Sequence, residues 1–242
     1  MKQALTNLDT VGNTNRRMIY KLVKTNTSQQ MKSMFKIVML LFVAMAFTSC
    51  SDDDDEGPQL EAVESKTASN IPAPQTGGQP SPDPIGGPFT KFSFATGAVT
   101  TDETEWDIAF RGTRIAVNGG VATGTADEPV RNGNAGAFIA TGTFASVTTA
   151  EGLTFIQDAD GAYAITPLSD EGWYNYNPQV NIISPIPGRV LVFRTHDGKY
   201  AKVEILSYYK DAPAQPDGFG DESRFYTFNY VYNPNAGETS LQ

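Results

Sequence analysis

The 242-residue chain has one cysteine and one histidine, and this scarcity excludes several kinds of chemistry. A single cysteine, Cys50, cannot form an intrachain disulfide. His196 is the only imidazole, so no other histidine could serve a nucleophilic triad, and its place at a predicted hairpin tip favours an exposed turn residue. Phosphate-binding loops, dinucleotide-binding fingerprints and the HExxH zinc motif are also missing. We therefore expect a protein that is not an enzyme.

Basic residues are scarce from Cys50 onward. Residues 50–242 contain 11 Lys and Arg against 26 Asp and Glu, a formal charge of −15, whereas the whole chain has −9. Such a surface repels the phosphates of nucleic acids, so DNA and RNA are not expected as partners. It also repels anionic lipid, so attachment to a membrane would require an anchor of another kind.

Long apolar runs are absent apart from Ile37 to Phe47, which follows Lys36. This run is too short for a transmembrane helix, which needs roughly 20 apolar residues. A basic start, a short apolar stretch and small residues at its end are typical of a secretory signal. The sequence Phe47-Thr48-Ser49-Cys50 resembles a bacterial lipobox, in which the cysteine thiol accepts a diacylglycerol. We expect residues 1–49 to be a leader, with Met31 or Met34 as a possible true start, and Cys50 to be the lipidated residue of an outer-membrane lipoprotein.

A polyacidic run and a Pro- and Gly-rich stretch follow the cysteine. Residues 52–56 are all acidic, which resembles the surface-export signal of Bacteroidetes lipoproteins, although a solvated charge run in a tether would look the same. Residues 57–88 have few large apolar side chains, and such a composition favours a partly stiff, disordered spacer. The sequence thus predicts a tether over 50–88 and one domain over 89–235.

Within this domain, short β-branched and aromatic runs alternate with Gly, Asn, Asp and Pro. Period-two alternation predicts strands at 92–94, 106–110, 115–117, 137–141, 153–156, 163–165, 189–194, 199–206 and 224–232. Asp197-Gly198 between two of these runs is a hairpin signal, because tight turns need positive φ. Almost no window carries a helical apolar stripe. We expect an all-β domain made mostly of antiparallel sheet.

Clustered aromatic residues are the main sign of a binding site. Trp173, Tyr174 and Tyr176 lie together in a predicted loop or strand edge, and Tyr208-Tyr209 precede a loop that contains Phe219. Exposed rings on a β scaffold stack on flat ligands such as sugars or planar cofactors. The same rings could instead fill the core, and the sequence leaves both interpretations open.

Several segments together resemble the HmuY-like family of Bacteroidetes haem-binding lipoproteins. They are Phe92-Ser-Phe94 with Gly97-Ala-Val99, Glu105-Trp-Asp-Ile-Ala-Phe110, Asn118-Gly-Gly120, Gly172-Trp173, Arg189-Val-Leu-Val-Phe-Arg194, Asp197 to Val203, and Thr227-Phe-Asn-Tyr230. The resemblance implies a hand-like all-β fold that holds haem in a cleft between projecting loops. It also implies a surface protein that takes haem from host haemoproteins and passes it to a TonB-dependent outer-membrane receptor.

The axial ligands of the family are not found at the matching positions. Its better-known members hold iron between two histidines and others use methionine, but all six methionines here lie between Met1 and Met45. A phenolate can ligate ferric haem. Tyr174 or Tyr176 could therefore replace one ligand, with Tyr163 near the other position and Arg189 as a basic neighbour. Stacking of a porphyrin without axial coordination, a glycan ligand, and a structural or adhesive role remain alternatives.

Overall fold

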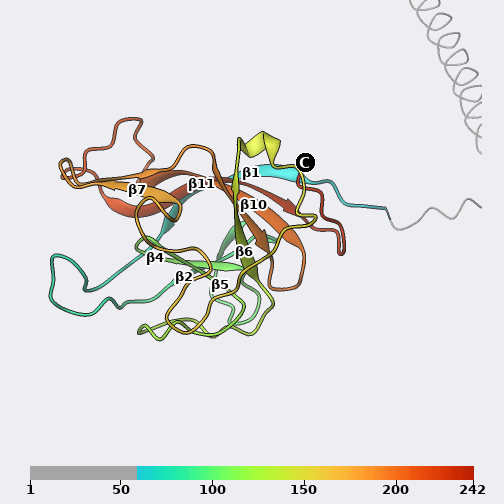
Figure 1. Cartoon of the computed structure of the whole chain (residues 1–242), viewed down its shortest axis with the longest axis horizontal. Helices are drawn as coiled ribbons and strands as arrows, with labels where there is room; N and C mark the ends of the chain where they lie inside the picture. Colours follow the sequence, from blue (N-terminus) through green and yellow to red (C-terminus); the bar gives the residue numbers. More distant parts are fainter. Residues whose placement is uncertain (1–58) are drawn as a thin grey trace, which may run out of the picture. The chain divides into compact units, whose positions relative to one another are not determined.

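The computed structural model describes residues 59–242 (Figure 1), so the predicted leader, the acidic run and Cys50 lie outside the described residues. Residues 59–242 form one compact unit of eleven strands and one short 3₁₀ helix, η1 (Phe144–Ser146). No helix in this unit is long and apolar enough to cross a membrane. The prediction of an all-β, antiparallel domain is confirmed.

The larger sheet has five strands, all paired antiparallel. In spatial order they are β1 (Glu64–Pro72), β11 (Ser223–Asn233), β10 (Tyr200–Tyr209), β9 (Arg189–Arg194) and β6 (Gly136–Thr141). Strands β9 and β10 form the predicted hairpin, and Gly198 in its turn has a φ of +88°. Glycine suits this position because other residues are strained at positive φ.

The smaller sheet has four strands, and a separate two-stranded hairpin lies beside strand β10 of the larger sheet. The smaller sheet has the order β3 (Ala98–Thr100), β2 (Thr90–Ser93), β4 (Ile108–Arg111) and β5 (Arg114–Val117), and the hairpin pairs β7 (Tyr174–Asn177) with β8 (Ile182–Pro185). In Figure 1 the strands β1, β10 and β11 lie above β2, β4 and β5, and long loops extend to the left of both layers.

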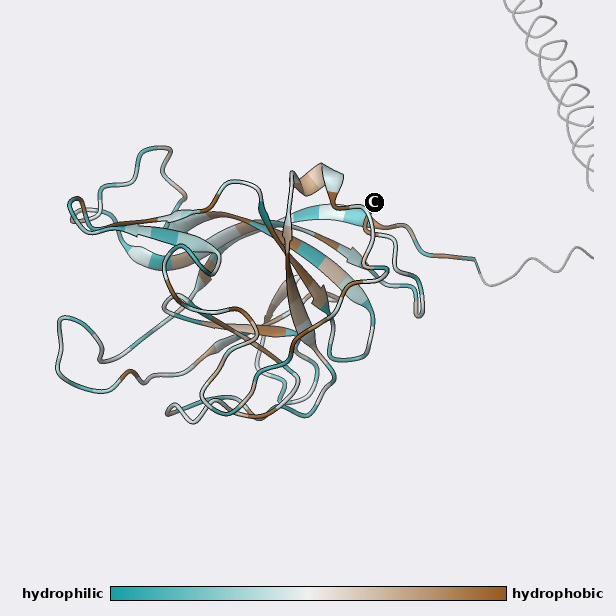
Figure 2. Cartoon of the chain, in the orientation of Figure 1, coloured by the Kyte–Doolittle hydropathy of each residue, from teal (hydrophilic) through white to brown (hydrophobic). Residues whose placement is uncertain are grey.

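Aromatic rings fill the space between the two sheets. Phe92 of β2 meets Phe228 of β11 with ring centroids 5.3 Å apart, and Phe110 of β4 meets Tyr226 at 4.5 Å. Figure 2 shows hydrophobic residues concentrated on the central strands and paler or hydrophilic residues along the projecting loops. Aromatic pairs at these distances add stability beyond the burial of their area. Tyr226, Phe228 and Tyr230 of β11 thus belong to the core.

The outer faces of the sheets are covered as well. Val192 of β9 packs with Ala150 and the fully buried Leu241, and Trp106 packs with Ala109 and Phe89 on the outer side of the smaller sheet. Burial on both faces explains why β9 is a continuous apolar run rather than an alternating one. It also extends the folded domain beyond residue 235, where the sequence analysis ended it.

The predicted tether is wrong for residues 64–73. Strand β1 pairs with β11 along the edge of the larger sheet, and Ala68, Ile71 and Ala73 are buried. The sequence analysis missed β1 because an edge strand buries only one face, here with small side chains, and therefore has a polar composition. A bulge near Asn70, which has a φ of +56°, further interrupts the alternation.

Two predicted strands, at 153–156 and 163–165, are not strands. Ile156 makes a single bridge to Ala137, and residues 159–162 form a tight turn. Leu153 and Phe155 pack against the cluster around Val192, whereas Ile165 is buried in the main core and the Ala164 N–H is bonded to the Asp158 side chain rather than to a neighbouring strand. The loop that contains Tyr163 lines the cleft described below.

Candidate ligand-binding cleft

Trp173 and Tyr174 lie in the core. They are 2% and 8% exposed, and the Trp173 ring centroid lies 5.1 Å from that of Tyr226. The Trp173 Nε1–H donates to the Thr113 carbonyl at 2.9 Å, and the Tyr174 hydroxyl donates to the Pro167 carbonyl at 2.7 Å. Both polar groups are therefore satisfied inside the protein. The interpretation of these two rings as an exposed stacking surface is wrong.

Tyr176 has a different environment from its two neighbours. It lies on β7 with 43% of its surface exposed, and its hydroxyl donates to the Asn181 side chain at 3.1 Å. Arg189 is not hydrogen-bonded to Tyr163, Tyr174 or Tyr176. Its guanidinium donates to the carbonyls of Asp170, Glu171 and Gly172, at 3.1, 2.6 and 2.7 Å. Arg189 thus braces the loop before β7, and the expectation that it assists a phenolate is not supported by its contacts.

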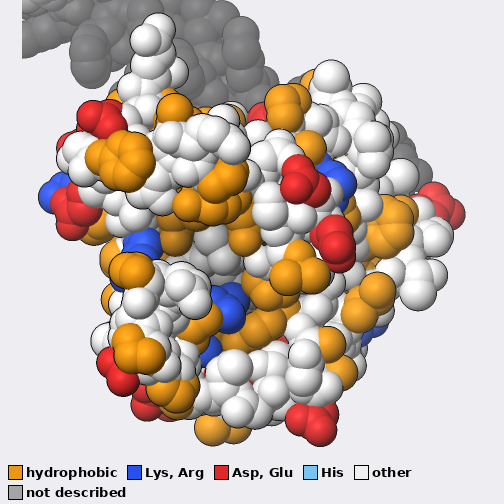
Figure 3. Space-filling model, turned by 60° about the vertical axis from the view of Figure 1, so that its left-hand side comes forward, with side chains coloured by type: hydrophobic (Ala, Val, Ile, Leu, Met, Phe, Trp, Pro, Cys, Tyr) orange, Lys and Arg blue, Asp and Glu red, His pale blue; other side chains and the backbone are white. Residues whose placement is uncertain are grey.

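Tyr163 lines an open cleft of about 360 Å³. The other lining residues are Arg114, Thr123, Thr125, Gly161, Ala162, Thr166, Pro167 and Leu168. This volume lies within the range of small-molecule sites. The lining combines one cation, three hydroxyl-bearing threonines and an apolar side formed by Pro167 and the exposed Leu168. Figure 3 shows one face of the molecule hollowed between projecting loops, with Lys and Arg side chains inside the hollow.

Asp158 holds the loop that carries Tyr163. Its buried carboxylate accepts hydrogen bonds from the backbone N–H of Ala164 at 2.8 Å and of Val117 at 3.1 Å, and it pairs with Arg131 at 2.9 Å. Val117 belongs to β5, so the loop is tied directly to the smaller sheet. Several hydrogen bonds to one buried carboxylate fix its geometry. The position of Tyr163 is therefore set by a rigid contact rather than by a free loop.

The phenol of Tyr163 belongs to a polar network behind the cleft. Thr125 Oγ1 donates to the Glu128 carboxylate at 2.6 Å and accepts from Arg111 Nη2 at 2.6 Å. The Tyr163 hydroxyl lies 3.1 Å from the same oxygen, and since the Thr125 proton is used by Glu128, Tyr163 is the donor. Burial acts to raise the pKa of Glu128, but hydrogen bonds from Thr123 and Thr125 outweigh it and lower this pKa to about 2.

Arg111 is fully buried in this network. Its guanidinium lies 4.2 Å from the centroid of the Phe89 ring and donates to the carbonyls of Gly87 and Ala126. Its Nε is buried without a hydrogen-bond partner, the one such side-chain atom found in residues 59–242. Burial lowers the pKa of Arg111, and nearby Tyr163 and Glu128 act in the opposite direction. A buried cation with an unused N–H favours negative charge beside it.

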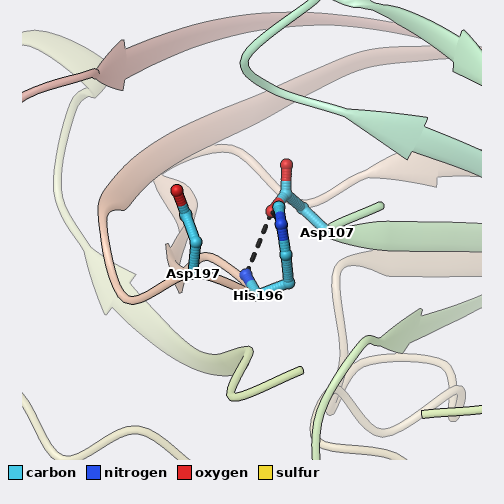
Figure 4. Close-up of side chains that lie close together, drawn as sticks. All are labelled: Asp107, His196 and Asp197. Atoms are coloured by element: carbon cyan, nitrogen blue, oxygen red, sulfur yellow. Dashed lines mark hydrogen bonds and ion pairs between the residues drawn. The ribbon is translucent and has the colours of Figure 1, made fainter. Parts of the chain in front are cut away.

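His196 is not the exposed turn residue that the sequence favoured. Its side chain is 15% exposed, its Nδ1 lies 2.8 Å from Asp107, and its Nε2 lies 3.2 Å from Glu105. Figure 4 shows the imidazole directed at the Asp107 carboxylate, with Asp197 beside it. The hydrogen bond with Asp107 raises the pKa of His196 to about 9, against the effect of burial. His196 therefore connects the β9–β10 turn to the start of β4.

Potential ligand atoms of Asp107, His196 and Asp197 lie within 4.8 Å of one another. A histidine must be neutral to bind a metal. Here the imidazole is protonated at neutral pH and its nitrogens are engaged by two carboxylates, so the arrangement is an ion pair rather than a metal site.

One comparison identifies the family of this chain. A family model described as HmuY protein matches residues 88–230, more than half of the chain. The chain belongs to the HmuY family. No match was found among proteins with curated descriptions.

Three of the solved structures similar to this HmuY-family chain come from Tannerella forsythia, Bacteroides vulgatus and Bacteroides fragilis. An apo HmuY analogue of Tannerella forsythia is 15% identical, with 74% of this chain and 100% of that chain covered and a TM-score of 0.46. A protein of Bacteroides vulgatus named as HmuY-like and haem-binding is 15% identical, with coverage of 71% and 93% and a TM-score of 0.41. A protein of Bacteroides fragilis named as a lipoprotein is 16% identical, with coverage of 61% and 83% and a TM-score of 0.39.

The cleft residues of this HmuY-family member fit an oxygen-ligated ferric porphyrin better than a histidine- or methionine-ligated one. Residues 59–242 contain no methionine, and His196 is not among the residues that line the cleft. Tyr163 supplies a phenol, the kind of oxygen that binds ferric haem. Arg114 supplies a cation suited to a carboxylate, and Leu168 an apolar surface suited to a macrocycle.

Proposed function

We propose that this protein is a surface lipoprotein that binds haem or a related porphyrin and delivers it to a TonB-dependent receptor in the outer membrane. The observation that carries the proposal is membership of the HmuY family, matched over residues 88–230. This is a family of haem-binding lipoproteins rather than of enzymes. The protein would act by binding and release, without transforming its ligand.

The chemistry of the cleft supports the proposal independently of the family. A porphyrin such as haem has a flat apolar body and two carboxylates on one edge. Arg114, half-buried at the start of β5, can pair with a carboxylate through two parallel N–H groups. Pro167 and Leu168 can contact the apolar body. The Thr123 hydroxyl donates its proton to Glu128 and therefore cannot donate it to a ligand. Arg114 is the one basic residue in the cleft lining and would contact an anionic ligand.

The proposed anchor is a diacylglycerol thioether on Cys50, which precedes the acidic run. Stable anchoring needs at least two acyl chains, which a processed lipoprotein carries. Host haemoproteins would supply the haem and the receptor would receive it. Replacement of Cys50 by Ser should remove radiolabelled palmitate from the protein and its membrane association, whereas a variant that stays in the membrane fraction would contradict the anchor.

A glycan-binding function has lost its main support. That alternative depended on the cluster of Trp173, Tyr174 and Tyr176 as an exposed stacking surface. Two of the three rings are buried, and both have their polar groups satisfied inside the domain.

A haemin titration of residues 59–242, followed by Soret absorbance, tests the proposed function. We expect saturable binding at one site. Arg114→Ala should weaken it by about tenfold to a hundredfold, since a charge-assisted hydrogen bond contributes roughly 1.5–3 kcal/mol. Lys210→Ala is the matched control, because Lys210 is a half-exposed cation paired with Glu222 and lies outside the cleft lining. If neither haemin nor iron-free protoporphyrin bound saturably, the proposed function would be wrong.

A further inference from the structure

The side chain that could bind iron is identified by comparing which imidazole, thioether and phenol groups of the folded domain reach the cleft. Within residues 59–242 the only imidazole is engaged by Asp107 and Glu105, and there is no thioether. The Tyr174 phenol is buried and donates to a carbonyl, and the Tyr176 phenol lies on β7 and outside the cleft lining. Tyr163 is therefore the one phenol that lines the cleft.

The Tyr163 ring is held on both sides. It packs against a small apolar cluster on the outer face of the smaller sheet, with its centroid 6.4 Å from that of Phe89. Its hydroxyl is fixed by Thr125, and its loop is fixed by the bond from Ala164 N–H to Asp158. A ligand atom positioned in this way costs little conformational entropy when it binds.

The network behind Tyr163 contains one cation, Arg111, and one anion, Glu128, and both are hydrogen-bonded to the Thr125 hydroxyl. Arg111 donates to the same Thr125 oxygen that the Tyr163 hydroxyl contacts, and its Nε–H is buried without a partner. When the Tyr163 oxygen gives up its proton, the Thr125 hydroxyl can turn from Glu128 and donate to that oxygen, while Arg111 continues to donate to the Thr125 oxygen. Arg189, which the sequence suggested as the basic neighbour of a phenolate, is bound to backbone carbonyls instead.

We propose that the Tyr163 oxygen would bind the iron of ferric haem in this cleft, with the Thr125 hydroxyl turning from Glu128 to donate a hydrogen bond to that oxygen. This inference rests on the proposed porphyrin-binding function. The Tyr163 oxygen exchanges its proton for the ferric ion, and the proton passes to water. No electron is transferred, so no oxidant or reductant is needed.

The test compares haemin with iron-free protoporphyrin IX for the wild type and Tyr163→Phe. We expect the wild-type haemin complex to show phenolate vibrations by resonance Raman spectroscopy. Tyr163→Phe should lose these vibrations and bind haemin about tenfold or more weakly, a change of roughly 1.4 kcal/mol per factor of ten. Its affinity for iron-free protoporphyrin should be unchanged, which also shows that the variant cleft is folded.

Two further variants separate an iron ligand from a merely structural residue. Tyr176→Phe removes a phenol of the same kind outside the cleft lining and should keep both the vibrations and the affinity. Thr125→Val keeps the shape of residue 125 but removes its oxygen, and it should shift the phenolate vibrations while leaving protoporphyrin binding intact.

The other possible results would contradict either the assignment of Tyr163 or the proposed function. Phenolate vibrations that persist in Tyr163→Phe, or a haemin affinity that this variant does not change, would overturn Tyr163 as the ligand while porphyrin binding stood. Absence of binding for both porphyrins would overturn the proposed function and the ligand assignment together.

Discussion

The contact between His196 and Asp107 makes stability depend on pH in a way that one substitution can reveal. Asp107 is buried, and its Oδ1 accepts from both the backbone N–H and the Nδ1 of His196, at 3.1 and 2.8 Å. Its other oxygen accepts from Phe94 N–H at 2.7 Å. His196→Gln keeps a polar side chain of similar reach but removes the positive charge. We expect it to destabilise the fold most at neutral and mildly acidic pH.

The size of the effect follows from the pKa of His196. The pKa rises from 6.5 to about 9 on folding, mainly through the hydrogen bond with Asp107. A change of this size corresponds to about 3 kcal/mol if the groups are shielded from water. The imidazole is 15% exposed and its second partner Glu105 is 71% exposed, so solvent screening reduces the expected contribution to about 1–2 kcal/mol.

The direction of the pH dependence is fixed by the sign of the shift. Because the folded pKa lies above the unfolded one, the stabilisation is complete below pH 6.5 and is lost as the pH rises through about 9. Urea unfolding of residues 59–242 at a series of pH values from 5.5 to 10 would measure it. The difference in unfolding free energy between the wild type and His196→Gln should shrink across this range.

Two control variants make the result specific. Asp107→Asn should remove the same pH dependence, whereas Glu151→Gln, at an exposed acidic residue, should leave it intact. Since His196 is the only histidine, no other imidazole can produce the effect. A difference between wild type and His196→Gln that stays constant from pH 6 to 10 would refute the assignment of a charged imidazole paired with Asp107.

Three further predictions concern the core, the edge strand and the network behind the cleft. Trp173→Ala should lower the free energy of unfolding by about 3–5 kcal/mol, as for other buried aromatics, and Tyr176→Ala by less than about 1 kcal/mol; equal losses in urea unfolding would contradict the burial of Trp173. Removal of residues 59–73 should expose the edge of β11 and lower the thermal unfolding temperature or cause aggregation, and an unchanged temperature would argue against β1 as part of the sheet. Because the pKa of Glu128 is lowered to about 2, the stability that its carboxylate contributes is present above pH 4.5 and is lost as the pH falls toward 2. Glu128→Gln should therefore reduce the loss of unfolding free energy at acid pH, and a loss as steep as that of the wild type would rule this out.

The sequence by itself determined the fold class and its strongest hairpin. Residues 189–194 and 200–209 are rich in β-branched and aromatic side chains, and Asp197-Gly198 supplies the residue types that a tight turn needs. These signals are local, so they can be recognised without knowing what the strands pack against. The family resemblance was also visible in sequence, because its motifs cover both sheets.

The placement of single aromatic side chains could not be predicted in this way. Trp173 and Tyr176 are three residues apart and look equivalent in the sequence, yet one is 2% and the other 43% exposed. The difference depends on tertiary contacts, because Trp173 immediately precedes β7 and packs against Tyr208 and Tyr226 of the larger sheet, whereas Tyr176 lies further along the β7–β8 hairpin. Strand β1 was missed for a related reason, since its partner β11 lies more than 150 residues away.

The sequence suggested Tyr163, but the residues that surround it were decided by tertiary structure. Arg111, Thr125 and Tyr163 come from a strand and two loops, and no motif links their spacing in the chain. They meet because the buried carboxylate of Asp158 ties the loop of Tyr163 to β5. Local propensity selects strands and turns, whereas contacts between distant segments depend on how the whole chain closes, and here those contacts place Arg111, Thr125 and Glu128 around the Tyr163 hydroxyl.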